Sequence, residues 1–182
     1  MKNVFIFLAD GFEEIEAIAP IDILRRAEID VTTVSISADK TVEGAHGVKI
    51  LADKIFSEVD CSTSDLLLLP GGGVGTQNLS QHTGLHALLQ KQHEEGKLVA
   101  AICAAPSVLG KLGILEGKEA ICYPGFEDKL TGATLSGNTV VKDGNIITGK
   151  GPGVAVPFAL KIVEALKGKL IADEVAEALM IN

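Results

Sequence analysis

Residues 98–112, LVAAICAAPSVLGKL, carry the clearest indication of the architecture of this chain. The first five of them, 98–102, are all apolar, which predicts a short strand buried on both faces of a sheet. Cys103 follows at once, and residues 104–112 have the spacing of a helix that ends at Gly113. A buried strand that runs directly into a helix is the repeating unit of α/β proteins with a parallel sheet.

The same alternation continues on both sides of this unit. We expect further buried strands at 4–9, 31–36, 65–69 and 146–148, and helices at 15–27, 79–93, 151–166 and 169–180. Pro20 should kink the first helix or begin a second segment. Residues 44–51 suggest a turn and a short strand, and 118–145 carry only short strands and turns. We therefore predict one domain over residues 1–182, with helices on both faces of a mostly parallel sheet.

Composition excludes several classes of protein. The net charge is −8 and the longest basic run is Arg25-Arg26, so we expect no general nucleic-acid-binding surface. No stretch approaches the roughly 18 apolar residues of a membrane span. The apolar run near the N-terminus is too short for a signal-peptide core. Three cysteines, Cys61, Cys103 and Cys122, are an odd number without metal-ligand spacing, which favours free thiols and a cytoplasmic location.

Three loops should meet at the carboxyl ends of the strands, where ligands bind in such sheets. They are DGFEEIE (10–16), PGGGVG (70–75) and ICAAPS (102–107). Glu13, Glu14 and Glu16 supply carboxyls there, although an acidic first turn also simply stabilises a helix. The glycine loop lacks the pattern of a dinucleotide or phosphate-binding loop, so we predict no cofactor. A better use for it is close approach to the thiol with N–H donors for an oxyanion.

Cys103 is the sharpest candidate for chemistry. Ala101 and Ala105 flank it two residues away on each side, in the manner of a nucleophile elbow. At a helix N-terminus its thiolate would be stabilised, so we expect a lowered thiol pKa. The alternative is a buried structural cysteine. No histidine is adjacent to it in sequence, and His82 and His86 suggest a solvated helix face, so we also predict no metal site.

Four motifs, in order along nearly the whole chain, resemble the ThiJ/PfpI superfamily, and in particular its DJ-one branch, which contains the parkinsonism-associated deglycase and the bacterial YajL proteins. They are DGFEEIEAIAPIDILRRA (10–27), LLLLPGGGVGTQNL (66–79), AAICAAPSVL (100–109) and GKGPGVAVPFALKIVEAL (149–166). The resemblance implies a flavodoxin-like three-layer sandwich with a nucleophile elbow at Cys103. It also implies a homodimer.

The resemblance further assigns roles to single residues. Cys103 is implied as the reactive, oxidisable cysteine, and Glu16 as the carboxyl that faces its sulfur. Gly72 and Ala104 are implied as backbone donors, and Pro152 as a wall of the pocket.

Two departures from the family pattern bear on mechanism. Ala104 stands where the peptidase branch has a histidine, which argues against amidase or peptidase activity. Tyr123 occupies the position of a pocket histidine, and His46 that of an arginine, so either residue is a candidate to replace a family pocket group.

The leading hypothesis is a cofactor-independent glyoxalase or deglycase linked to oxidative and carbonyl stress. It would act on methylglyoxal, glyoxal or their early adducts through Cys103 and Glu16. The alternative is a non-enzymatic redox sensor or chaperone that uses oxidation of Cys103.

Overall fold

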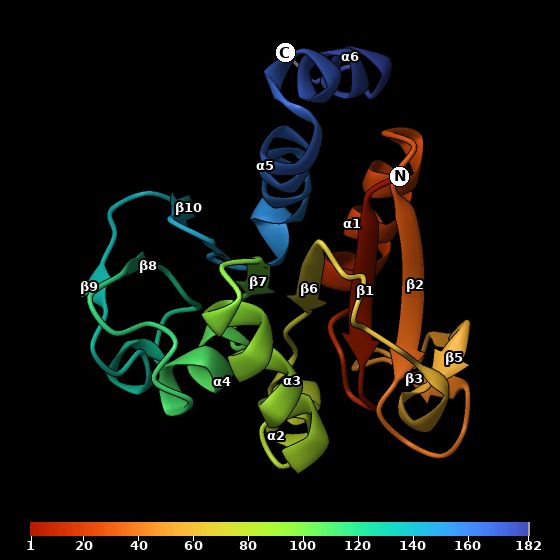
Figure 1. Cartoon of the computed structure of the whole chain (residues 1–182), viewed down its shortest axis with the longest axis vertical. Helices are drawn as coiled ribbons and strands as arrows, with labels where there is room; N and C mark the ends of the chain where they lie inside the picture. Colours follow the sequence, from red (N-terminus) through yellow and green to blue (C-terminus); the bar gives the residue numbers. More distant parts are fainter. Residues whose placement is uncertain (182) are drawn as a thin grey trace.

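The computed structural model describes residues 1–181, which are built around a seven-stranded sheet (Figure 1). The strand order is β10-β11-β7-β6-β1-β2-β5, and all neighbours are parallel except β10 and β11. The strands are β1 (Asn3–Leu8), β2 (Asp30–Ser35), β5 (Lys54–Ile55), β6 (Leu66–Leu69), β7 (Leu98–Ile102), β10 (Val140–Asp143) and β11 (Ile146–Gly149). The predicted mostly parallel α/β fold is confirmed.

Helices cover both faces of this sheet. One face carries α1 (Glu14–Arg26), α5 (Ala155–Lys167) and α6 (Lys169–Ala178), and the other carries α2 (Gly73–Leu79), α3 (Thr83–Glu94) and α4 (Pro106–Lys111). Alternate strand residues feed the two layers: Ile6 packs in the core beneath α1 and α5, whereas Phe7 packs in the core beneath α3 and α4. In Figure 1 the green helices α2–α4 and the blue helices α5–α6 form separate groups.

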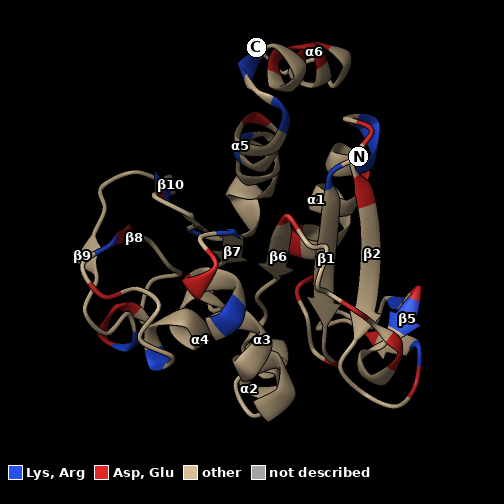
Figure 2. Cartoon of the chain, viewed as in Figure 1, with Lys and Arg blue, Asp and Glu red and all other residues tan. Residues whose placement is uncertain are grey.

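The remaining elements are short and lie outside the main sheet. They are the paired strands β3 (Thr41–Glu43) with β4 (Lys49–Leu51) and β8 (Glu119–Ala120) with β9 (Thr134–Leu135), and the 3₁₀ turns η1 (Phe56–Glu58), η2 (Glu127–Lys129) and η3 (Pro152–Val154). Acidic and basic residues alternate over the ribbon in Figure 2, without a continuous basic stripe on the elements in view. No helix within residues 1–181 has the length and apolar character needed to cross a membrane.

The helix predicted at 79–93 is α3, which begins four residues later, at Thr83, and the preceding helix α2 was not predicted. The glycine loop turns into α2 already at Gly73, because Gly72 adopts a φ of 91° that a side chain would disfavour. A break follows, and α3 starts where the His82 Nδ1 atom accepts the Leu85 N–H at 3.0 Å. His82 is therefore a helix cap packed against Phe56, and its assignment to a solvated face was wrong.

Two other boundaries differ from expectation. The first helix, α1, runs from Glu14 to Arg26 with the buried Pro20 inside it, so the predicted second segment does not exist. Proline there removes one helical hydrogen bond, and burial of the apolar face of the helix offsets that loss. The helix after Cys103 begins only at Pro106, whose missing N–H has no helical partner at that position.

Candidate functional site

The candidate site lies at the carboxyl ends of β1, β6 and β7. The strands β1 and β6 are neighbours, but the chain leaves β1 for α1 on one face and β6 for α2 on the other. Such a switch point opens a crevice between the two loops, and open α/β sheets bind ligands there. The predicted meeting of the three loops at this edge is confirmed by the contacts described below.

Cys103 occupies the turn between β7 and α4 in a strained backbone conformation. Its φ is 66°, in the left-handed region that residues with a side chain seldom adopt. The turn is held by its N–H donating to the Gly149 carbonyl at 2.9 Å and by its carbonyl accepting the Tyr123 N–H at 2.8 Å. The residue is 8% exposed. This is the geometry of a nucleophile elbow, as the sequence predicts.

Glu16 lies on the other side of Gly71 from this cysteine. Its side chain is fully buried, and Oε2 accepts the Gly71 N–H at 2.9 Å. The Oε1 atom is buried and makes no hydrogen bond with any residue from 1 to 181. A Cβ on Gly71 would come within 2.5 Å of Glu16 Oε2 and 2.7 Å of Cys103 Cβ. Glycine at this position therefore lets the carboxyl and the thiol lie next to each other.

The carboxyl and the thiol influence each other's proton affinity. Burial raises the pKa of Glu16 to about 7, against the lowering effect of its interaction with Cys103 and of the Gly71 N–H. Burial, and then the charge of Glu16, raise the pKa of Cys103 to about 12. The predicted lowering of the thiol pKa is therefore wrong, because the nearby carboxylate and the buried position outweigh the local dipoles. The pair carries one proton and one negative charge between these two values.

Backbone donors converge on the sulfur. The N–H groups of Gly72 and Ala104 favour the thiolate and lower the pKa of Cys103, against the larger opposing effects. Gly72 reaches this position because the loop packs closely on the preceding one: a Cβ here would collide with the Gly11 carbonyl. The structure thus brings Gly72, Ala104, Glu16 and Cys103 together. Such a set can supply a nucleophile, an acid–base group and donors for an oxyanion.

Tyr123 and Pro152 belong to two segments that lie next to each other. A Cβ on Gly151 would be 3.1 Å from the Tyr123 ring, which places the ring against the segment that contains Pro152. The Tyr123 side chain is 46% exposed, and Pro152 is half-buried. Tyr123 contacts Cys103 through its backbone N–H. The Tyr123 hydroxyl makes no hydrogen bond within residues 1–181.

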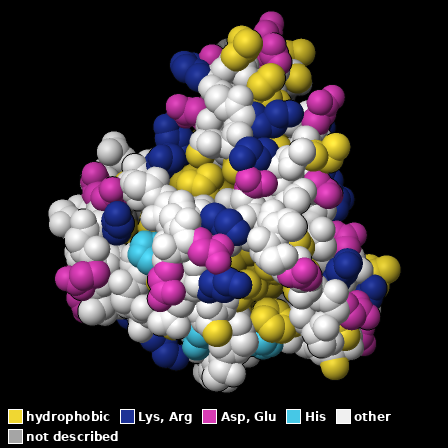
Figure 3. Space-filling view, in the orientation of Figure 1, with side chains coloured by type: hydrophobic (Ala, Val, Ile, Leu, Met, Phe, Trp, Pro, Cys, Tyr) yellow, Lys and Arg dark blue, Asp and Glu magenta, His cyan; other side chains and the backbone are white. Residues whose placement is uncertain are grey.

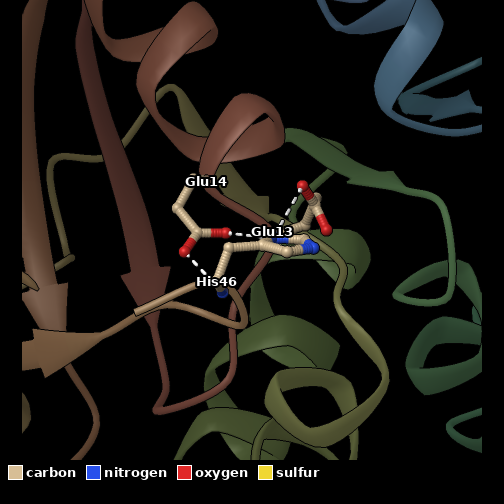
Figure 4. A group of neighbouring side chains, drawn as sticks. All are labelled: Glu13, Glu14 and His46. Carbon is tan, nitrogen blue, oxygen red and sulfur yellow. Dashed lines mark hydrogen bonds and ion pairs between the residues drawn. The ribbon is translucent and has the colours of Figure 1, made fainter. Parts of the chain in front are cut away.

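His46 belongs to a group with Glu13 and Glu14 at the start of α1 (Figure 4). Its Nδ1 atom is 2.9 Å from Glu14 Oε2 and 3.7 Å from Glu13 Oε1. The hydrogen bond with Glu14, and then the charge of Glu13, raise the pKa of His46. Although burial opposes it, hydrogen bonds from His46 and from the Val48 N–H leave the pKa of Glu14 below its usual value. Within residues 1–181, no histidine hydrogen-bonds to Cys103.

The same three side chains offer donor atoms within 4.8 Å of one another, a set of the type that binds divalent cations. The prediction of no metal site did not anticipate this group. Glu14 is already engaged, because its Oε1 accepts the His46 N–H at 2.7 Å.

Sequence reasoning also missed two backbone contributors. Gly71 separates the carboxyl from the thiol, and Gly149 accepts the cysteine N–H. The run of three glycines after a buried strand was a usable signal for the first. Nothing local marks the second, because it depends on the pairing of β11 with β7.

The structure combines a flavodoxin-like sandwich, a cysteine at a nucleophile elbow and a buried glutamate beside the thiol. Comparisons with known proteins identify the class of proteins that has this fold. The DJ-1/PfpI family model matches residues 2–165. The chain belongs to the DJ-1/PfpI family, which confirms the resemblance.

Relatives from several organisms extend this result. The chain is 43% identical to protein DJ-1 homolog A of Arabidopsis thaliana over all of its own length, but spans only 47% of that protein. It is 41% identical to protein dj-1beta of Drosophila melanogaster, with 99% of this chain and 97% of that protein covered. It is 38% identical to the glutathione-independent glyoxalase DJR-1.2 of Caenorhabditis elegans, with 92% and 90% covered.

Solved structures agree in fold over the whole chain. Oxidized DJ-1 of Toxoplasma gondii superposes with a TM-score of 0.96 at 37% identity, covering 100% of this chain and 99% of that one. Drosophila melanogaster DJ-1beta superposes with a TM-score of 0.94 at 41% identity, covering 100% and 98%. These likenesses confirm the three-layer α/β fold.

Proposed function

We propose that this protein is a cofactor-independent enzyme of the glyoxalase or deglycase type, which acts on methylglyoxal, glyoxal or their early adducts. The observation that carries the proposal is the strained Cys103 beside the buried, protonatable Glu16, with two N–H groups directed at the sulfur. A relative that is named a glutathione-independent glyoxalase supports it.

The reaction begins with addition of the Cys103 sulfur to the aldehyde carbon of methylglyoxal. The thiolate is the nucleophile, and it forms when the single proton of the pair rests on Glu16. A C–S bond forms, the carbonyl electron pair moves to oxygen, and the N–H groups of Gly72 and Ala104 hold that oxyanion. Glu16 gives its proton to this oxygen, which forms a hemithioacetal and leaves Glu16 as a carboxylate that can act as a base.

Glu16 then moves protons within the adduct. It takes the proton from the former aldehyde carbon and returns it to the neighbouring carbon, while the hydroxyl proton moves to the former ketone oxygen, which leaves a thioester on Cys103. Water hydrolyses the thioester, and lactate and the free thiol are released. The sum is methylglyoxal plus water to lactate, so the reaction needs no external oxidant or reductant. Tyr123 and Pro152 form the rim of the pocket in this scheme.

Lactate release from methylglyoxal by the purified protein tests the proposal. Cys103→Ser should abolish release, while Cys61→Ser, at another buried free cysteine, should leave it intact. Glu16→Gln should lower turnover by about 10²–10⁴-fold, the usual loss for a positioned acid–base group. Lactate release that is equal with and without Cys103 contradicts the proposal.

A redox or chaperone function of Cys103 is the second candidate. One structural relative is an oxidized DJ-1, and a sulfinate on Cys103 would meet the same N–H donors that favour the thiolate. Mild peroxide should then add two oxygens to Cys103, and Glu16→Leu should change the product distribution seen by mass spectrometry. Amidase activity has less support, because Ala104 supplies no base to activate the thiol.

We also propose that the protein is a homodimer and works in the cytoplasm. Ile15, Ile18 and Val48 expose apolar side chains at the start of α1 and beside it. The backbone N–H of Val48 donates a hydrogen bond to Glu14 Oε1 at 3.4 Å, which fixes the position of Val48 next to α1. Such a patch favours an interface between copies. The three free cysteines support a reducing compartment.

A further inference from the structure

A second concave surface lies between α2, α4 and η2. It has a volume of about 670 Å³ and is lined by Gly73, Thr76, Ser107, Lys111, Phe126 and Lys129, among others. Cys103 does not line it. The cavity has the size of sites that hold small molecules. None of Glu16, Gly72 and Ala104 lines it either, so it is a different site from the one above.

The charge of this cavity is opposite to that of the protein as a whole. The chain has a net charge of −8, yet two lysines and a single acid, Asp128, line the cavity. Within residues 1–181, neither Lys111 nor Lys129 forms an ion pair, because no carboxylate oxygen lies within 4.0 Å of either ammonium nitrogen. Burial, and then the charge of Lys111, lower the pKa of the nearby His86. The two lysines outnumber Asp128, so the lining carries a net positive charge. The Lys111 ammonium donates to the Ser80 carbonyl at 2.7 Å, and the Lys129 ammonium lies 4.5 Å from the centre of the Phe126 ring. An ammonium has three N–H donors, so each lysine can still bind an anion.

The other groups of the lining are mostly hydroxyls and an amide. Ser80, Thr131 and Gln77 line the cavity with Ser107. The Ser107 hydroxyl donates to the Ala104 carbonyl at 2.6 Å, and the Ser80 hydroxyl donates to the Gln77 carbonyl at 2.9 Å, which leaves both oxygens as acceptors. The buried Thr76 hydroxyl makes no hydrogen bond with any residue from 1 to 181. Phe126 is the apolar exception.

We propose that this cavity binds a phosphorylated polyhydroxy compound of the size of a sugar phosphate. Lys111 and Lys129 would bind the phosphate oxygens by charge-assisted hydrogen bonds. The hydroxyl and amide groups would bind the polyol, whose hydroxyls both donate and accept. The inference stands apart from the proposed reaction at Cys103, because it rests on other residues and another cavity.

Calorimetric titration with glucose 6-phosphate as the probe tests the proposal. The wild-type protein should bind it, and binding should weaken as salt is added because the charges are partly exposed. The double variant Lys111→Gln/Lys129→Gln should weaken binding at least about tenfold. The matched control Lys54→Gln/Lys150→Gln removes two lysines that also lack ion pairs but lie outside the cavity, and it should bind as the wild type does. Thr76→Val should weaken binding without changing the charge.

Two comparison probes define the ligand class. Glucose without the phosphate should bind far more weakly than glucose 6-phosphate, and inorganic phosphate should bind more weakly as well. The proposal is overturned if the wild type does not bind the probe or if the cavity variant and its control bind equally. Equal affinity for glucose and glucose 6-phosphate overturns the role of the lysines, and equal affinity for inorganic phosphate overturns the role of the polyol.

Discussion

At the scale of single residues, Glu16 couples the chemistry of the site to the stability of the protein. The side chain is fully buried and its pKa is raised to about 7. The folded state therefore holds this proton more tightly than the unfolded state, in which the carboxyl has its ordinary pKa near 4.5. The stability that the protonated form contributes is fully present below about pH 4.5, and it is lost as the pH rises through about 7.

This linkage predicts the pH dependence of unfolding. Between about pH 5 and pH 8, the wild type should lose stability on the order of 3 kcal/mol from this group. Glu16→Gln should lack that loss, since the amide does not titrate and its oxygen can still accept the Gly71 N–H. Urea unfolding at several pH values measures it, with Glu94→Gln on the exposed side of α3 as the control. Parallel pH profiles for the wild type and Glu16→Gln would contradict the assignment.

Gly71 gives a second residue-scale prediction. Gly71→Ala would place a Cβ within 2.5 Å of Glu16 Oε2 and 2.7 Å of Cys103 Cβ, so the carboxyl and the thiol must move apart. We expect a stability loss of about 1–3 kcal/mol, as in other overpacked sites, and a loss of turnover near 10²-fold from misplacement of about 1 Å. Measurements of lactate release and of urea unfolding test both effects.

The matched control is two residues further along the same loop. A Cβ on Gly73 meets nothing within 4 Å, and this position begins α2, where alanine is the better helix former. Gly73→Ala should therefore keep turnover and stability or gain slightly in stability. If the two variants behave alike, the close packing around Gly71 is not what positions the site.

At the scale of elements, the cap of α3 can be tested by itself. His82 Nδ1 accepts the Leu85 N–H, and the ring also packs on Phe56 with centroids 4.3 Å apart. His82→Ala should lower stability by about 1 kcal/mol or more, through loss of the cap and the ring contact. His82→Asn loses the ring but keeps a capping acceptor, so it should be more stable than His82→Ala in thermal unfolding. Equal stabilities would show that the cap contributes nothing.

The same element shows why some boundaries could be predicted and others could not. The strand at 98–102 was found at its observed limits, because five apolar residues end at a cysteine and a following turn. The start of α3 was placed four residues too early, because histidine is an unusual cap and its side chain is fixed by Phe56 from a distant segment. Similarly, Pro20 does not interrupt α1, since packing against the core outweighs the single lost hydrogen bond.

Some residues of the candidate site could likewise be predicted from the sequence, and others could not. Cys103 could be found from its position after a buried strand, and the resemblance supplied Glu16. The role of Gly71 and Gly149 depends on how three strands are paired, which the local pattern does not contain. The sign of the thiol pKa shift was mistaken because the burial of Cys103, and then the charge of Glu16, outweigh the nearby N–H donors, and the sequence does not show how deeply the thiol is buried.

At the scale of the whole molecule, apolar side chains are exposed in two regions, one beside the candidate site and one on α6. Ile15, Ile18 and Val48 are 55%, 43% and 50% exposed beside the candidate site, at the start of α1. Leu170 is 71% exposed on α6, which forms the upper end of the molecule in Figures 1 and 3, where hydrophobic side chains are also in view. The proposed dimer uses the first region, whose residues Ile15 and Ile18 stand on either side of Glu16 in α1.

Light scattering after size-exclusion chromatography tests this geometry. The wild type should have twice the 19.0 kDa mass of one chain, and Ile15→Glu/Ile18→Glu should shift it to the single-chain mass. Two carboxylates on this surface would have to be desolvated against a second copy, and burying unpaired charge is strongly unfavourable. Leu170→Glu adds the same type of charge at the α6 end and should stay dimeric. A dimer that survives the first variant and dissociates in the second would place the interface on α6, and a wild type at the single-chain mass would exclude the dimer.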